Sequence, residues 1–272
     1  MALSSYFLVT ADHRVASIRQ AGLLYLVMAH LGALAILLSF GILPGGSWQL
    51  TFDAMRAARL PPAWAAAAYL LALFGFGAKA GLVPLHVWLP EAHPAAPSPV
   101  SALMSGVMLK AAIYGFLRVT FDLIGGPAWW WGLVPLGLGL FTALYGVVFA
   151  AVQTDMKRLL AYSSIENMGI LFAGLGLALV FQGAGMNTLA TLALLAVLYH
   201  ALNHAFMKSL LFTGTGAVLH ATGERNMGRL GGLIQRMPWV AWTALIGALA
   251  LAGLPPLHGF VSEWLLLQAF LL

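Results

Sequence analysis

The sequence contains no cysteine among its 272 residues. Disulfide bonds and thiolate-ligated iron–sulfur clusters are therefore excluded within this chain, so any redox centre must lie in a partner. Charge is also scarce, because Asp, Glu, Lys and Arg together make up 8% of the residues, against roughly 25% in soluble domains. With 61% hydrophobic residues, the chain cannot cover a water-facing surface. It belongs in a lipid bilayer.

Nucleotide-binding motifs are missing as well. The sequence has neither a P-loop nor a Gly-x-Gly-x-x-Gly turn after a strand, so we expect no nucleotide and no other cofactor in this chain. The net charge of +5 does not indicate a nucleic-acid partner, because basic loops at one face of a membrane protein explain it more simply.

Long apolar runs dominate what is present. Each of them reaches the ~20 residues that a helix needs to cross a bilayer, and their hydrophobicity is continuous. The predicted fold is therefore an all-α, polytopic membrane helical bundle in a single membrane domain, residues 1–272. The predicted spans are 20–43, 63–90, 97–120, 129–152, 158–181, 188–220 and 238–272.

The loop charges predict an orientation for this bundle. If the spans cross alternately, one side of the membrane carries most of the basic loop residues and the other carries few. The first side holds Arg14, Arg19, Lys157, Arg158, Arg225, Arg229 and Arg236, and the second holds Arg56, Arg59 and Arg118. The positive-inside rule makes the first side cytoplasmic.

An internal repeat lies within two of the apolar runs. Residues 80–86 read A-G-L-V-P-L-H, and residues 252–258 read A-G-L-P-P-L-H, so the copies differ only at the fourth position. Gly and Pro remove helical hydrogen bonds and favour a break. Paired interrupted spans in two parts of a chain are typical of a transporter site near the bilayer midplane. We therefore predict two broken helices.

Two lysines lie inside predicted spans. Lys79 is in the run G-F-G-A-K-A and Lys110 is in V-M-L-K-A-A. A charged lysine at the centre of a membrane helix costs at least ~2.5 kcal/mol on insertion scales, so such residues are expected to be functional. Desolvation also penalises the charged form, which suits a group that both accepts and releases a proton.

A third cluster stands in the run H-A-L-N-H-A-F-M-K. Its spacing of four places His200, His204 and Lys208 on one helical face, where three titratable groups would form a ladder for protons. Two histidines four apart also suit zinc. However, Ala201 stands where a zinc protease motif has glutamate, and the lysine cation would oppose a metal. No metal site is expected.

The remaining candidates are acidic residues and histidines within or beside the spans. Glu263 lies in the last apolar run and is expected to close a path near one face or to pair with a lysine. Glu166, His86 and His258 are secondary candidates, the histidines because they occupy matching places in the repeat. His13, His30, His93 and His220 receive no functional assignment.

Three long motifs carry a family resemblance: the stretch from K-A-G-L-V-P-L-H to G-V-M-L-K at 79–110, Q-T-D-M-K-R-L-L-A-Y-S-S at 153–164, and H-A-L-N-H-A-F-M-K-S-L-L-F at 200–212. They resemble the antiporter-like subunits of respiratory complex I and related complexes. Within these, S-S-I-E-N-M-G at 163–169 and the G-F-V-S-E-W ending are most similar to the hydrogenase-4 component B, or formate hydrogenlyase subunit 3, family.

The resemblance implies a fold of two inverted repeats, here about 1–125 and 126–272, in a bacterial inner membrane. It also implies proton translocation, with peripheral hydrogenase and iron–sulfur subunits and other membrane subunits as partners. The alternatives are a Na+/H+ antiporter subunit of the Mrp type and a proton-pumping subunit of complex I. Whether the assembly is an enzyme depends on those partners. The proton path would use Lys79, Lys110, His200, His204, Lys208 and Glu263.

One departure from the family pattern concerns the ends of the chain. In the family, a W-E-x-M segment precedes the S-S-Y-F that is found here at 4–7, and its glutamate partners the lysine of the first broken helix. Further spans also commonly follow the second break. The sequence is therefore expected to be a core fragment of such a subunit.

Overall fold

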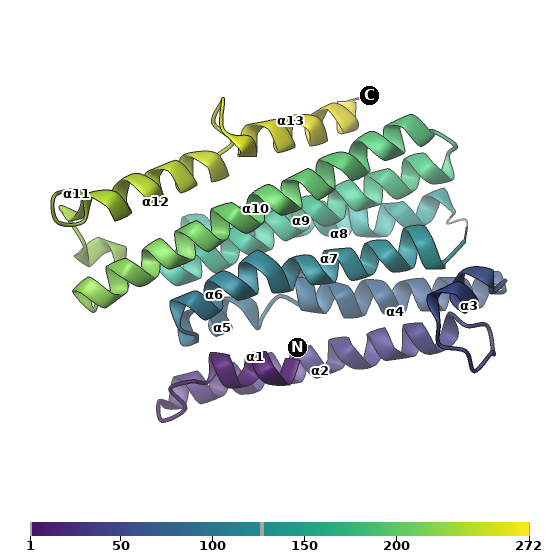
Figure 1. Cartoon of the computed structure of the whole chain (residues 1–272), viewed down its shortest axis with the longest axis horizontal. Coiled ribbons are helices and arrows are strands. Elements are labelled where there is room, and N and C mark those ends of the chain that lie inside the picture. The colour runs from purple at the N-terminus through teal and green to yellow at the C-terminus, as the bar shows by residue number, and fades with distance from the viewer. Residues whose placement is uncertain (1, 126–127, 272) are drawn as a thin grey trace.

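The computed structural model describes residues 2–125 and 128–271. Helices lie side by side along the long axis of the molecule, with α10 and α9 in the middle and α12–α13 and α1–α2 at opposite edges (Figure 1). The α-helices are α1 (Ala2–Val9), α2 (Ala16–Ile42), α3 (Phe52–Ala57), α4 (Pro62–Ala80), α5 (Leu89–Ala95), α6 (Ser98–Leu103), α7 (Leu109–Leu117), α8 (Leu133–Ala151), α9 (Met156–Gly183), α10 (Asn187–Thr222), α11 (Leu233–Arg236), α12 (Pro238–Leu251) and α13 (His258–Leu271).

The predicted helical membrane bundle is confirmed. Within the described residues, six helices are long and apolar enough to cross a membrane, counting 98–123 and 129–151 as continuous crossings. The chain is a multi-pass membrane protein. The seventh predicted span, 238–272, is not one helix, because it divides into α12 and α13.

Both predicted breaks occur at the repeated motif. Helix α4 ends at Ala80 and helix α5 begins only at Leu89, while α12 ends at Leu251 and α13 begins at His258. The second residue of each motif, Gly81 or Gly253, has a positive φ of 82° or 63°, a conformation that glycine adopts without steric penalty. Each motif also contains a cis X-Pro bond at the same place, Val83–Pro84 and Pro255–Pro256. The two breaks therefore share their backbone course, whereas the repeat boundaries near residue 125 stay a prediction.

One crossing is irregular. Between α6 and α7 the helix widens to π-helical geometry over Met104–Met108 (η1), and it widens again over Arg118–Leu123 (η2). Such π segments inside α-helices are frequent at functional sites. The first of them ends two residues before Lys110.

The closest helix packing joins α8 to α9. Glycines spaced by seven residues, at 132, 139 and 146 on one side and 169, 176 and 183 on the other, face the opposing helix. A Cβ atom built on Gly139 would lie 2.4 Å from the backbone nitrogen of Ala173 and 2.6 Å from the carbonyl oxygen of Gly169. Small residues allow helix backbones to approach closely in a bilayer, where association depends on van der Waals packing. Helix α9 is thereby held in the interior of the bundle.

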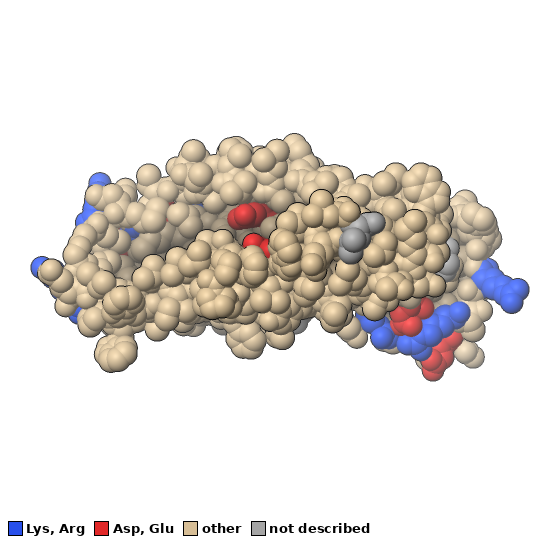
Figure 2. All heavy atoms as spheres, turned by 90° about the horizontal axis from the view of Figure 1, so that it is seen from above, with Lys and Arg blue, Asp and Glu red and all other residues tan. Residues whose placement is uncertain are grey.

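Ion pairs mark the two ends of the bundle, where Figure 2 shows the basic side chains. At one end Arg56 and Arg118 bind Asp122 at 2.8 and 2.9 Å. At the other end Arg158 binds Glu91 and Arg225 binds Asp155. This separation agrees with the two sets of loop residues that the sequence assigns to opposite faces. We call the second cluster, Glu91, Asp155, Arg158, Glu224, Arg225 and Arg229, the basic end.

The glycine contacts predict a sharp difference between two neighbouring positions. Gly139→Leu should lower the stability of the folded chain by about 1–3 kcal/mol, the range typical of overpacking, because the new side chain meets the backbone of α9. Gly137→Leu is the matched control, because no atom lies within 4 Å of a Cβ built there. Denaturant unfolding in detergent measures both variants, and equal stability of the two would contradict this account of the α8–α9 packing.

Candidate functional site

The ladder predicted on α10 lies in the interior of the bundle. His200, His204 and Lys208 each have 0% exposed surface. The two imidazole rings are nearly parallel, with centroids 6.3 Å apart and an interplanar angle of 24°. The spacing of four therefore places the three groups in one polar stripe along the helix.

Lys110 extends this stripe toward the first part of the chain. Its Nζ lies 2.5 Å from Nδ1 of His204 and 2.6 Å from the carbonyl oxygen of Ser105, which belongs to the π segment. Two cations cannot share so short a contact in a medium of low dielectric constant. The pair therefore holds one excess proton at most, and a change in the charge of one group alters the proton affinity of the other. The amine also opposes a zinc ion at this histidine.

His200 connects the ladder to the second break. Its Nε2 lies 3.0 Å from Oδ1 of Asn167, and its Nδ1 lies 3.0 Å from the hydroxyl of Ser262. The amide of Asn167 donates to the carbonyl of Ser163, so its oxygen faces the ring and Nε2 is the donor. The Ser262 hydroxyl also lies 2.9 Å from the Gly259 carbonyl oxygen. The hydroxyl can therefore donate to a neutral His200, or turn to that carbonyl and accept from a protonated one.

Two glutamates lie near the end of this path. Glu166 on α9 interacts electrostatically with Lys208 and with Glu263, and it lines a cavity of about 570 Å³ between α9, α10 and α12. Glu263 lies over the second break, because a Cβ atom added to Gly253 would meet one of its carboxylate oxygens at 2.4 Å. In the part of the chain that the structure describes, Glu263 pairs with no lysine. Figure 2 shows acidic side chains in a hollow midway along the molecule, between its charged ends.

Lys79 occupies a separate place. It lines a cavity of about 210 Å³ together with Tyr25, Trp88 and Met108. Its methylene stem lies beside the contact between α2 and α4, where Gly32 and the backbone of Gly75 meet. Among the described residues its Nζ has no hydrogen-bonding or ion-pair partner. The cavity also touches Ala111 and Ala112, which directly follow Lys110, so it reaches the helix that carries the second lysine.

The paired histidines of the repeat lie in different surroundings. His86 is buried and its ring meets the ring of Tyr145 edge to face at 4.7 Å. His258 begins α13, and its carbonyl accepts a hydrogen bond from the Asn203 amide at 2.8 Å. Since Asn203 stands between His200 and His204, this bond ties the second break to the ladder. The first break has no matching bond to α10 among the described residues.

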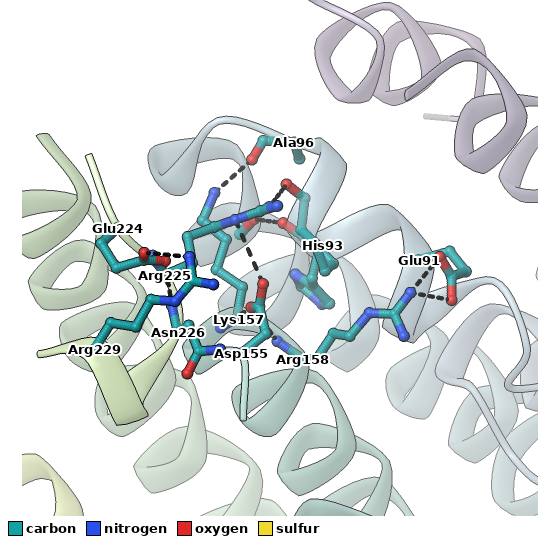
Figure 3. Close-up of polar contacts among 12 residues, drawn as sticks. Glu91, His93, Ala96, Asp155, Lys157, Arg158, Glu224, Arg225, Asn226 and Arg229 are labelled. Atoms are coloured by element: carbon teal, nitrogen blue, oxygen red, sulfur yellow. Dashed lines mark hydrogen bonds and ion pairs between the residues drawn. The ribbon is translucent and has the colours of Figure 1, made fainter. Parts of the chain in front are cut away.

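The basic end closes one extremity of the bundle. Arg158 donates two bonds to Glu91, at 2.6 and 2.7 Å, and Asp155 accepts from the first backbone N–H groups of α9 (Figure 3). Arg225 reaches both the Asp155 carboxylate and the carbonyl of Pro94. Backbone N–H groups of Asn226 and Arg225 lower the pKa of Glu224, so this loop glutamate stays charged. The loop after α10 is therefore fastened to the end of α5 and the start of α9.

Two buried residues near this end have no functional assignment from the sequence. Lys157, which the sequence places in a basic loop, is 2% exposed, and its Nζ donates to the Ala96 carbonyl at 2.7 Å. His93, which the predicted spans also leave in a loop, is fully buried against α10. The sequence does not predict this burial, because His93 stands next to a proline and Lys157 next to a loop. The burial depends on how α5 folds back from the break. No sequence signal separates His93 from His13 or His220.

Comparisons with known proteins agree with this geometry. The profile of a family described as "NADH:quinone oxidoreductase/Mrp antiporter, TM" matches residues 1–272. Hydrogenase-4 component B of Escherichia coli K12 is 48% identical over 97% of this chain and 39% of its own length. Formate hydrogenlyase subunit 3 of the same organism is 39% identical over 99% of this chain and 43% of its own length.

Among solved structures, the Mrp complex from Dietzia sp. DQ12-45-1b has a subunit with a TM-score of 0.85 and 33% identity. The match covers 98% of this chain and 28% of that one. The chain thus spans about two-fifths of the length of the curated relatives named here.

Proposed function

Because the chain belongs to the NADH:quinone oxidoreductase/Mrp antiporter transmembrane family, we propose that it moves protons across the membrane as the antiporter-like part of a hydrogenase-type, complex I-related assembly. The observation that carries the proposal is the contact of Lys110 with His204. It joins titratable groups from distant parts of the sequence inside a helical bundle. A proton that reaches either group can pass to the other without leaving the interior.

The proposed path runs from Lys79 to His204 and branches there. Lys79 receives or supplies a proton in its own cavity, and Lys110 passes it to His204. From there it moves along α10, toward Lys208 in one direction and toward His200 and Ser262 in the other. Glu263 beside Ser262 then releases it at the second break. Glu166 interacts with Lys208 through its charge.

The partners follow from the chemistry that this chain lacks. Without cysteine it cannot ligate an iron–sulfur cluster through thiolates. Electrons would pass through peripheral iron–sulfur and hydrogenase subunits, and further membrane subunits would adjoin the bundle. Support comes from the names of two relatives, hydrogenase-4 component B and formate hydrogenlyase subunit 3. A change of charge or conformation in those subunits would alter the proton affinity of the buried lysines.

Replacing the buried amines tests the proposal. Lys79→Ala and Lys208→Ala should each reduce donor-driven proton transfer by at least about tenfold, because each removes a proton-accepting group from the path. This is a conservative bound, since a positioned proton-transferring group typically contributes about 10²-fold or more to a rate. Proton uptake by inverted vesicles that contain the complete assembly measures the rate per amount of subunit. Arg236→Ala is the control, since this arginine lies on the surface. Near-normal transfer in both lysine variants would refute the proposed path.

A second candidate function is Na+/H+ antiport, which the likeness to the Mrp complex favours. The same residues would then serve exchange rather than redox-driven pumping. On our proposal, vesicles that lack an electron donor should show little sodium-dependent proton movement, because the driving reaction is absent. Fluorescent detection of pH changes after a sodium pulse measures it. Rapid, donor-independent exchange would instead establish the antiporter.

A further inference from the structure

The polar stripe of α10 stops before the basic end. Continuing the spacing of four from Lys208 leads to Phe212, which is fully buried and carries no group that can hold a proton. His93 on α5 stacks on the ring of Phe212, with centroids 4.6 Å apart and an interplanar angle of 17°. The His93 imidazole thus lies beside Phe212, the position at which the line of titratable groups on α10 is interrupted.

Of the buried histidines described above, His93 has the fewest hydrogen bonds at its ring nitrogens among the described residues. The side chain is 0% exposed, and neither Nδ1 nor Nε2 has a hydrogen-bonding partner among the described residues. The majority of buried polar atoms are paired, and each exception asks for an explanation such as an ordered water or a chemical role. Stacking on Phe212 holds the ring, and a bond from the Ser101 hydroxyl to the His93 carbonyl holds its backbone. The ring is fixed, while both nitrogens stay available.

Lysines from different helices interact with this ring through their charge. His93 interacts electrostatically with Lys208 on the ladder and with Lys157 at the start of α9. The carbonyl of Pro94, the following residue, accepts from Arg225, and that of Ala96 accepts from Lys157 (Figure 3). Arg225 and Lys157 therefore fix the backbone of the residues that follow His93. His93 lies between the buried ladder and the basic end, whose charged groups reach water.

We propose that His93 is the relay residue that carries protons between the basic end and Lys208, an inference that rests on the proposed function. A neutral imidazole accepts a proton at one ring nitrogen from the side of Lys157 and releases the proton of its other nitrogen toward the neutral amine of Lys208. One N–H bond forms and one breaks, so the ring is neutral again as its other tautomer. A water molecule on either side of the ring would complete the transfer, and return of the ring to its first tautomer resets the relay.

The test uses the complete assembly in inverted vesicles. His93→Phe keeps an aromatic ring to stack on Phe212 but removes both nitrogens, and it should slow donor-driven proton transfer by at least about tenfold. His220→Phe is the matched control, because this histidine is exposed on the last turn of α10, and its rate should stay within about twofold of the unmodified protein. A rate for His93→Phe that equals the control would overturn the proposal.

A second variant separates a relay from a purely structural role. His93→Ala leaves space for a small solute, so added imidazole should restore a substantial part of the lost rate if a titratable ring is what the site needs. A slow His93→Ala that imidazole does not restore would overturn the relay and leave a packing role. Lys208→Ala is measured alongside. If it is slow while His93→Phe is normal, only this inference fails, whereas normal rates in both would remove the proposed path itself.

Discussion

The contact between Lys110 and His204 is the interaction on which the rest of this molecule depends. A bilayer penalises every charge that it contains, so a lysine inside it needs either a partner or a reason to lose its proton. Here the partner is a histidine, which competes for the same proton. The two groups therefore do not carry a positive charge at the same time. A carboxylate in place of His204 would instead hold the lysine permanently charged.

The fold serves to place these groups and to keep lipid away from them. Glycines at intervals of seven let α8 lie against α9 closely enough that α9 is mostly interior, and α9 supplies Asn167 and Glu166 to the path. The π segment before Lys110 presents the Ser105 carbonyl to the amine. The two breaks place Ser262 and Glu263 beside α10 at one site and carry α5 back into the bundle at the other. Both breaks and the first π segment thus coincide with contacts of the proposed path.

Much of this arrangement is predictable from the sequence, and the reasons are physical. Long apolar runs require spanning helices, and the repeated Gly and Pro residues require the breaks at Gly81 and Gly253. A spacing of four requires that His200, His204 and Lys208 share a face. The pairing of Lys110 with His204 is not predictable in this way, because it depends on how α7 and α10 cross. The same holds for Lys157 and His93, whose burial follows from the fold of α5 rather than from their neighbours in sequence.

The most direct test of the central contact is a double-mutant cycle on Lys110 and His204. Lys110→Arg and His204→Gln are suited to it, because each is mild enough to leave a measurable rate of donor-driven proton transfer. If the two groups share one proton, the rate of the double variant should be close to that of the slower single variant, with a coupling of at least about 1 kcal/mol. Rates that multiply, so that the double variant loses the product of the two single losses, would contradict the account.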